Sequence, residues 1–181
     1  MTLIYLNPRK QPRLKNYDYS QNGYYFVTVC TQNQAEWFGR IENDRMRLNE
    51  YGRIVDEQWL WLGRQYPYAV LDVYVTMPNH FHGIIGIDVG AGRDRPLRKI
   101  KSLSELIGAF KMTSSKAIHN VGLADFRWQR SFYDHVIRGE SSLGRVREYI
   151  ANNPKQWALD VENAANRGMD AGAYYENIIS E

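Results

Sequence analysis

The sequence predicts an α+β fold, a ferredoxin-like sandwich in which an antiparallel sheet carries two helices on one face and a further helix follows the last strand. Three observations predict it. The chain has 181 residues, which suits one domain of ordinary size. Its strand-like and helix-like segments follow the order β-α-β-β-α-β. Helical periodicity then returns once more, after the fourth strand.

The composition is that of a globular protein. Apolar residues make up 44% of the chain and charged residues 24%, which argues against extended disorder. No apolar run reaches the roughly 18 residues that span a membrane, and the N-terminus lacks the apolar segment of a secretory signal. Cys30 is the single cysteine, which excludes an internal disulfide and fits a reducing compartment. We therefore expect a soluble, cytoplasmic protein with no membrane partner.

The first strand and the first helix follow a polar, basic segment, residues 1–22, which we interpret as an N-terminal arm. Residues 23–31 are rich in β-branched and aromatic side chains, which predicts a strand. Apolar residues then return at spacings of three and four over residues 49–65. This spacing predicts a helix, which Pro67 closes.

Two strands and a second helix form the middle of the chain. Residues 69–76 and 81–89 predict strands, and the break at residues 77–79 indicates that the two are neighbours in the sheet. A loop rich in glycine and arginine covers residues 90–101. Apolar residues over about 103–119 then predict the second helix of the sandwich.

The last predicted strand spans residues 128–137. A third helix is expected to begin near Ser141 or Ser142, since either hydroxyl can act as an N-cap. We expect it to end at Asn153, because Pro154 cannot continue the backbone hydrogen bonds of a helix.

Charge is unevenly distributed along the chain. From Asp160 onward there are five acidic residues and one basic residue, a net charge of −4, so the total of +3 leaves +7 on residues 1–159. We interpret residues 159–181 as an acidic C-terminal tail and residues 23–158 as the central domain. Basic residues gather in the arm (Arg9, Lys10, Arg13, Lys15) and in the 90–101 loop (Arg93, Arg95, Arg98, Lys99, Lys101). Such clusters suit a nucleic-acid backbone, and a solvated basic face is an equally good interpretation of charge alone.

Two histidines form a candidate metal site. His80 and His82 are two residues apart on a predicted strand, so both imidazoles lie on one face of the sheet and Phe81 lies on the other. Two neutral imidazoles at this spacing can chelate one divalent cation. A pair of hydrogen-bonded structural histidines is the alternative, and a metal would need further ligands from elsewhere.

The third helix offers further candidates for the site. Tyr149 and Asn153 are four residues apart, so they lie one turn apart on one flank of the apolar stripe of the helix. At the margin of a core, such side chains can be held firmly and still face a site. Taken alone, Tyr149 is better explained by ordinary amphipathic packing, and Asn153 is equally well a polar residue at the helix C-terminus before Pro154.

In combination, five ordered blocks of sequence resemble the REP-associated tyrosine transposases, a branch of the single-tyrosine HUH nucleases and transposases. REP stands for repetitive extragenic palindrome. The resemblance covers roughly residues 13 to 157, and its blocks are residues 17–28, 75–83, 108–111, 128–138 and 147–157. The second block contains the His-hydrophobic-His motif of residues 80–82.

The resemblance implies a role for each matching residue. His80 and His82 match the histidines that hold a divalent metal, Tyr149 matches the nucleophile, and Asn153 matches the residue that completes the metal site. The implied reaction is cleavage and rejoining of single-stranded DNA hairpins of REP sequences through a 5′-phosphotyrosine. Mg²⁺ or Mn²⁺ is the expected cofactor, and the two imidazoles favour Mn²⁺. Residues 23–158 are then the catalytic domain.

The DNA partner is expected to contact basic side chains outside the catalytic cluster. We predict that Arg9, Lys10, Arg13 and Lys15 of the arm contact DNA beside the hairpin, with Lys111 and Arg130 as weaker candidates for contacts with the backbone. The protein is expected to be a monomer or a homodimer and to associate with the nucleoid. His135 and Cys30 are interpreted as residues of the core, with support of the site as a minority view for His135.

Three alternatives stay open. The first is a hairpin-binding module that has lost catalysis, for which metal and Tyr149 do not matter for binding. The second is a metal-dependent nuclease with a water nucleophile, for which Tyr149→Phe still cleaves. Replication-initiating and plasmid-mobilising HUH enzymes share the chemistry but are usually larger chains.

Overall fold

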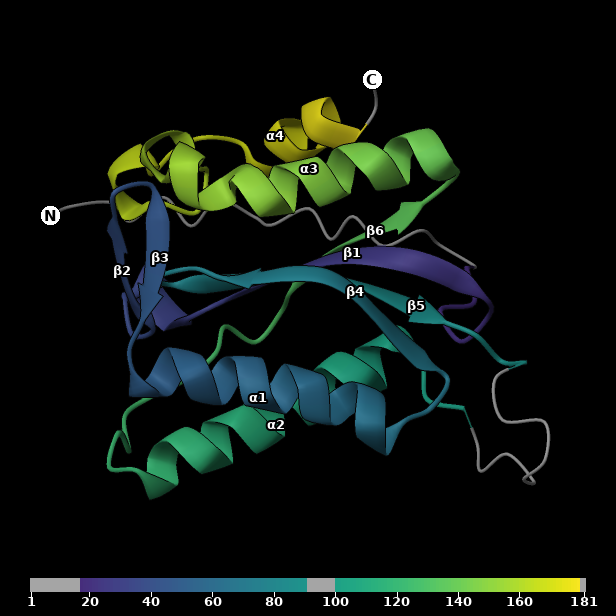
Figure 1. Cartoon of the computed structure of the whole chain (residues 1–181), viewed down its shortest axis with the longest axis horizontal. Helices are drawn as coiled ribbons and strands as arrows, with labels where there is room; N and C mark the ends of the chain where they lie inside the picture. Colours follow the sequence, from purple (N-terminus) through teal and green to yellow (C-terminus); the bar gives the residue numbers. More distant parts are fainter. Residues whose placement is uncertain (1–16, 91–99, 180–181) are drawn as a thin grey trace, which may run out of the picture.

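The computed structural model describes residues 17–90 and 100–179 and shows a sheet between two layers of helices (Figure 1). All neighbouring strands are antiparallel, in the spatial order β4-β5-β1-β6. This is the strand order of the predicted ferredoxin-like sandwich, so the predicted fold class is confirmed. The strands are β1 (Gly23–Cys30), β4 (Ala69–Thr76), β5 (His80–Ile87) and β6 (Tyr133–Ile137). The helices are α1 (Glu50–Gln65), α2 (Leu103–Asn120), α3 (Glu140–Gln156) and α4 (Ala171–Ile179).

Helices α1 and α2 cover one face of the sheet, and α3 and α4 lie over the other (Figure 1). Phe81 of β5 belongs to the first layer, where its ring centroid lies 4.7 Å from that of Trp59 in α1 and 5.1 Å from that of Phe110 in α2. The flanking His82 belongs to the other layer, where its ring lies 5.3 Å from Tyr149 of α3. The alternation of side chains along a strand therefore directs the histidines towards α3, as the sequence predicted.

Local signals explain where α1 and α2 begin. The side chain of Asn49 accepts a hydrogen bond from the backbone N–H of Gly52 at 3.0 Å, which caps α1. Ser102 and Glu105 form a reciprocal capping box at the start of α2. Because these signals are local, the predicted helices over 49–65 and 103–119 agree with the observed ones to within about a residue at each end.

Helix α3 differs from the prediction at both ends. Its N-cap is Gly139, with a φ of 98°, and neither Ser141 nor Ser142 caps it. Its C-terminal end passes through Pro154 and reaches Gln156. Proline costs this helix one backbone hydrogen bond, and contacts of the last turn offset the loss: the side chain of Asn153 binds Asp160, and Trp157 packs on His80.

A β-hairpin between β1 and α1 was not predicted from the sequence. It consists of β2 (Gly39–Glu42) and β3 (Arg45–Leu48), and its two-residue turn has φ values of 50° at Asn43 and 58° at Asp44. Asparagine and aspartate tolerate this left-handed conformation better than other residues with a β-carbon, so the turn has a sequence signal that was missed. The fourth strand is also shorter than predicted, since Trp128 only forms an isolated bridge with Thr31 before β6 begins.

The segment predicted as an acidic tail is largely folded onto α3. It contains the 3-10 helices η2 (Trp157–Leu159) and η3 (Ala164–Asn166), followed by α4. Tyr175 and Ile179 of α4 are buried in the same apolar cluster as Phe26 and Tyr149. This packing buries Asp160 completely and leaves Glu162 half-buried, which the lack of periodicity in this segment did not predict.

Across residues 17–90 and 100–179, none of the helices has the length and apolar character needed to cross a bilayer.

Candidate active site

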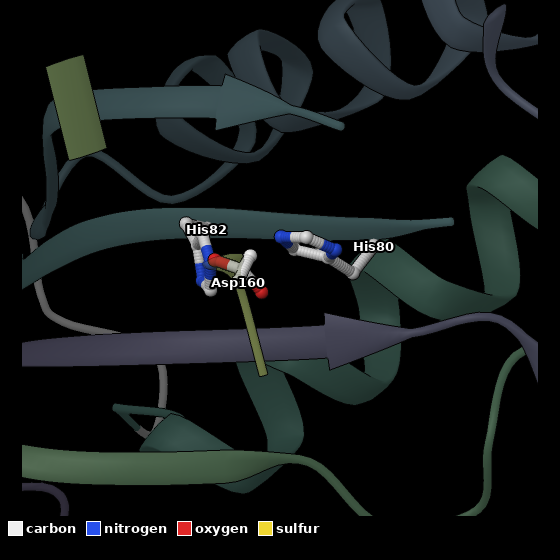
Figure 2. Close-up of side chains that lie close together, drawn as sticks. All are labelled: His80, His82 and Asp160. Carbon is white, nitrogen blue, oxygen red and sulfur yellow. The ribbon is translucent and has the colours of Figure 1, made fainter. Parts of the chain in front are cut away.

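Three side chains from two distant segments converge between the sheet and α3. His80 and His82 project from β5, and Asp160 comes from the turn after η2 (Figure 2). One ligand atom from each lies within 4.8 Å of the others, and all three residues are fully buried. Two imidazoles and a carboxylate at this separation form a donor set that suits a divalent cation.

The orientation of His80 is fixed by Asn79. The side-chain N–H₂ of Asn79 donates to the carbonyl oxygen of Glu162 at 2.8 Å and to that of Gln34 at 3.2 Å. Its Oδ1 therefore faces Nδ1 of His80 at 2.8 Å, which assigns the imidazole proton to Nδ1. Nε2 of His80 is buried and has no hydrogen-bond partner among the described residues. Such a buried lone pair is what a bound cation would require.

His82 lies between the sheet and the tyrosine. Its Nδ1 is 2.9 Å from Oγ1 of Thr28, and its Nε2 is 3.2 Å from the phenolic oxygen of Tyr149. Thr28 is directly opposite His82 in the register of β1 and β5, so the pairing of these two strands brings the two side chains into contact. Both imidazole nitrogens therefore have partners within the site.

Helix α3 contributes two side chains, Tyr149 and Asn153, which lie on the same flank of the helix, one turn apart. Tyr149 donates its hydroxyl hydrogen to Oδ2 of Asp160 at 2.9 Å. Asn153 donates from Nδ2 to the same oxygen at 2.6 Å. Oδ1 of Asn153 is buried with no hydrogen-bond partner among the described residues. After Nε2 of His80, it is a second atom with a free lone pair that could coordinate a cation. The backbone N–H of Glu162 donates to the other oxygen of Asp160 at 2.7 Å.

Burial controls the protonation of the cluster. It lowers the pKa of His80, an effect that nearby Asp160, Glu162 and Asn153 oppose. Burial and the neighbouring His80 lower the pKa of His82 well below its ordinary value, so both imidazoles are neutral at pH 7 and able to bind a cation. Burial and the charge of Asp160 raise the pKa of Tyr149 well above 10, so its hydroxyl keeps its proton in this arrangement.

The fit to a divalent metal is good. The cluster combines two imidazoles with oxygen donors, and two of its buried polar atoms, Nε2 of His80 and Oδ1 of Asn153, have no hydrogen-bond partner among the described residues. Leaving two such atoms unsatisfied in a protein interior is costly, and a cation would remove that cost. The donor set suits Mn²⁺ or Mg²⁺, with the imidazoles favouring Mn²⁺.

The site is covered by the C-terminal segment. Tyr149 is only 6% exposed, and its ring lies about 6.3 Å from those of both Tyr174 and Tyr175 in α4. The hydroxyl of Tyr175 donates to Oε1 of Glu162 at 3.2 Å, which ties α4 to the turn that carries Asp160. The same segment therefore supplies a residue of the site and closes it.

The other predicted site residues lie apart from this cluster. The ammonium group of Lys111 donates to the carbonyl oxygens of Gln129 and Arg130, and burial lowers its pKa to about 8. Arg130 is exposed.

His135 is half-buried on β6, opposite Phe26. Cys30 is buried on β1, as expected. Lys101 of the loop is among the residues that the structure describes. The other basic residues predicted to bind DNA, or noted in the loop, lie outside the described residues: Arg9, Lys10, Arg13 and Lys15 of the arm, and Arg93, Arg95, Arg98 and Lys99 of the loop.

Sequence reasoning missed Asp160. It is one of five acidic residues in the last 22 positions, and nothing in its local sequence distinguishes it from the others. Its only signal is its position just after the predicted end of the tyrosine helix. The reversal of the chain at η2 brings it back against Tyr149, and that reversal depends on tertiary packing.

Comparison with known proteins supports the resemblance found in the sequence. A Haemophilus influenzae protein described as uncharacterized is 38% identical over 168 residues, which cover 86% of this chain and 93% of the relative. No family model matches the chain. The solved structure of a REP-associated tyrosine transposase bound to a REP hairpin is similar at a TM-score of 0.58 and 19% identity, over 82% of this chain and 75% of that chain. The chain therefore belongs to one family with the Haemophilus influenzae protein and has the fold of a REP-associated tyrosine transposase.

Proposed function

We propose that this protein is a divalent-metal-dependent endonuclease and strand transferase that acts on single-stranded DNA hairpins of the REP type through a covalent phosphotyrosine at Tyr149. One observation carries the proposal. The phenolic oxygen of Tyr149 lies 3.2 Å from Nε2 of His82 and 2.9 Å from Oδ2 of Asp160, inside a buried cluster whose donor atoms suit a metal. A structural tyrosine needs no such surroundings.

Tyr149 is the nucleophile of the proposed reaction. Its phenolic oxygen forms a bond to phosphorus while the bond from phosphorus to the 3′-oxygen of the preceding nucleotide breaks, and that oxygen leaves as a 3′-hydroxyl after taking a proton from solvent. Asp160 already accepts the hydroxyl hydrogen of Tyr149, so its carboxylate is placed to take the phenolic proton. A cation held by His80, His82 and Asp160, with Asn153 in reach, would neutralise charge on a non-bridging phosphate oxygen.

The second half of the reaction is strand transfer. The phosphotyrosine ester retains the energy of the broken phosphodiester, so a 3′-hydroxyl from another strand can attack it and restore a DNA linkage. The attacking 3′-hydroxyl gives its proton to solvent, and Tyr149 recovers its own proton from Asp160. The outcome is cleavage and rejoining of DNA, with no net hydrolysis.

The proposed substrate is an unpaired strand that carries a REP-type hairpin. The solved relative is bound to a REP hairpin, and this chain shares its fold. The basic arm would contact DNA beside the hairpin. We place the protein at the nucleoid of the cytoplasm as a monomer or a homodimer. Because Tyr149 is buried under α4, the cover over the site must move before a phosphate can reach the phenol.

The test is a denaturing gel of protein mixed with labelled hairpin DNA of several sequences and Mn²⁺. We expect a slower, protease-sensitive band with the wild type, and no such band with Tyr149→Phe or with the His80→Ala, His82→Ala double variant. Tyr24→Phe removes an exposed tyrosine outside the site and serves as the matched control.

Two results would contradict the proposal. Cleavage that persists in Tyr149→Phe would indicate a water nucleophile. Hairpin binding without cleavage or a covalent band, across all the sequences tried, would indicate an inactive binding module.

A further inference from the structure

The helix that carries Tyr149 is tied to the edge of the sheet by an ion pair. Arg147 of α3 donates from Nε to both carboxylate oxygens of Asp72 in β4 at 3.2 Å, and from Nη2 to Oδ2 at 2.6 Å. A guanidinium that uses two nitrogens on one carboxylate fixes an orientation as well as a distance. Arg147 belongs to the same block of sequence as Tyr149, yet it has no role in the proposed reaction.

The strand that carries Asp72 departs from regular pairing at this point. Between Leu71 and Tyr74, β4 has one residue more than the paired interval of β5, which is a β-bulge. Leu71 and Tyr74 both pack in the layer of α1 and α2, and Val73 packs in the apolar cluster under α3. The bulge thus directs two successive side chains towards α3, with Val73 in the core and Asp72 on Arg147.

The carboxylate of Asp72 is fixed before α3 meets it. The backbone N–H of Val73 donates to its Oδ1 at 2.6 Å. Its side chain is 16% exposed, against 44% for that of Arg147. The hydrogen bonds from Arg147 lower the pKa of the Asp72 carboxyl, so the group is ionised at pH 7. Asp72 is therefore a fixed anchor on the sheet for α3.

Arg147 and Tyr149 lie on opposite flanks of α3. Residues two apart in a helix are separated by about 200° around its axis, and the buried stripe of Val146 and Ile150 lies between these two flanks. Apolar contacts of such a stripe are non-directional, so they resist rotation of the helix only weakly. The contact of Arg147 with Asp72 is directional and fixes one flank, while Tyr149 extends from the other towards the site.

A small rotation of α3 would matter for the proposed reaction. A turn of about 10° moves an atom at the outer radius of a helix, about 5–6 Å from the axis, by about 1 Å. Misplacement by about 1 Å can cost about 100-fold in rate, because the reacting atoms must be aligned. The position of Tyr149 therefore depends on what fixes the rotation of its helix.

The flank of Arg147 keeps its contact when the cover over the site moves. On the other flank, Nη2 of Arg145 donates to the carbonyl oxygen of Ile179 in α4 at 2.9 Å, and movement of α4 breaks this hydrogen bond. The contact between Arg147 and Asp72 involves only α3 and β4. It is thus a restraint on α3 that does not depend on α4.

We infer that Arg147 and Asp72 are positioning residues whose ion pair fixes the rotation of α3 and thereby aligns Tyr149 with the phosphate. The inference rests on the proposed function for the role of Tyr149 as the nucleophile. Exposed ion pairs add little to global stability, so the effect of this pair belongs to the rate of reaction rather than to the unfolding temperature.

The first experiment measures formation of the covalent adduct in a single turnover, with Mn²⁺ and increasing concentrations of labelled hairpin DNA. It separates the rate at saturation from the DNA concentration that gives half of that rate. The variants are Arg147→Ala, Asp72→Asn and the double variant. Lys155→Ala, which removes a positive charge from an exposed position of the same helix, is the matched control. Thermal unfolding verifies that each variant folds.

We expect each single variant to lower the rate at saturation by about five- to ten-fold, because a pair can bias a position by no more than its own interaction energy. The double variant should be no slower than the single variants, since the two residues act as one unit. The two substitutions change the charge of the protein in opposite directions. A direct contact of Arg147 with DNA would therefore weaken binding in Arg147→Ala and leave Asp72→Asn at the rate of the control.

The second experiment needs no cleavage. ¹⁹F NMR follows the protein labelled with 3-fluorotyrosine, in EDTA and without DNA. The line of Tyr149 is identified by its absence from the spectrum of Tyr149→Phe. We expect Arg147→Ala and Asp72→Asn to shift or broaden this line, whereas Lys155→Ala leaves it as in the wild type.

Rates in both variants equal to that of the control would overturn the inference, as would a loss confined to Arg147→Ala. The two proposals fail separately. If the wild-type protein forms no covalent band while the line of Tyr149 changes in both variants, the proposed chemistry is wrong and the positioning of Tyr149 by the pair stands. If the band forms at the rate of the control in both variants, the positioning role is wrong and the proposed chemistry stands. An unchanged line together with no covalent band would reject both.

Discussion

The phenolic oxygen of Tyr149 lies 2.9 Å from Oδ2 of Asp160, although one residue belongs to α3 and the other to the turn that follows it. This contact gives the candidate nucleophile a proton acceptor. The side chain of Asn153 and the backbone N–H of Glu162 hold the carboxylate in place. Tyr149 therefore combines a carboxylate acceptor with a contact to an imidazole nitrogen, Nε2 of His82 at 3.2 Å.

Replacing Asp160 by Asn should slow formation of the covalent DNA adduct by about 100-fold or more, because a positioned proton acceptor contributes roughly that factor. Binding of the uncleaved hairpin should change little. Single-turnover kinetics with Mn²⁺ measure the first quantity and anisotropy the second. Asp170→Asn, at an exposed acid of the same segment, is the control. An unchanged rate in Asp160→Asn would remove this residue from the reaction.

Asn79 should act through His80. Replacing Asn79 by Ala removes the acceptor that keeps the imidazole proton on Nδ1, so Mn²⁺ affinity should fall by about 10- to 100-fold. Titration calorimetry measures this directly, without any need for DNA. Asn22→Ala, at an exposed asparagine whose Oδ1 accepts from the backbone N–H of Val89, should leave the affinity unchanged. Equal affinity in the two variants would contradict the role given to Asn79.

The metal-free protein should lose stability as the pH falls below about 6.5, the ordinary pKa of an unfolded histidine. Burial lowers the pKa of His80 and His82 in the folded state, so in that range the unfolded chain binds more protons than the folded one. Urea unfolding in EDTA should show a loss of about 1–3 kcal/mol between pH 7.5 and 5.5. A His80→Gln, His82→Gln variant should lack most of this dependence. If it keeps the full dependence, other groups are responsible.

Gly83 should be intolerant of a side chain. A β-carbon there would lie 2.8 Å from the ring of Phe81 and 2.9 Å from that of Trp59, so Gly83→Ala should destabilise the fold by about 1–3 kcal/mol. Gly108 lies in α2 with nothing within 4 Å of such a β-carbon, so Gly108→Ala should stabilise by about 0.5–1 kcal/mol. Urea unfolding compares the two, and a neutral Gly83→Ala would show that the rings can move aside.

The basic arm stays a prediction from the sequence. Replacing Arg9, Lys10, Arg13 and Lys15 by Ala should weaken hairpin binding and reduce the slope of log affinity against log salt by about three units, if all four contact phosphates. Anisotropy titrations at several salt concentrations measure this. An unchanged slope would show that the arm does not bind the DNA backbone.

The sequence by itself determined the order of the sandwich's strands and helices along the chain, the limits of α1 and α2, and the shared faces of His80 with His82 and of Tyr149 with Asn153. Each of these follows from periodicity or from a capping residue within a few positions, which the chain encodes locally. The resemblance to a family then gave the four residues their expected roles.

Only the tertiary structure decided the rest. Asn79 joins two distant segments through its hydrogen bonds to Gln34 and Glu162, and Asp160 meets Tyr149 through a reversal of the chain. Their meeting depends on how α4 packs on α3 and how the turn after β1 meets the segment before β6. No local pattern encodes such contacts, because the burial of apolar side chains that drives them depends on the whole core rather than on neighbours in sequence.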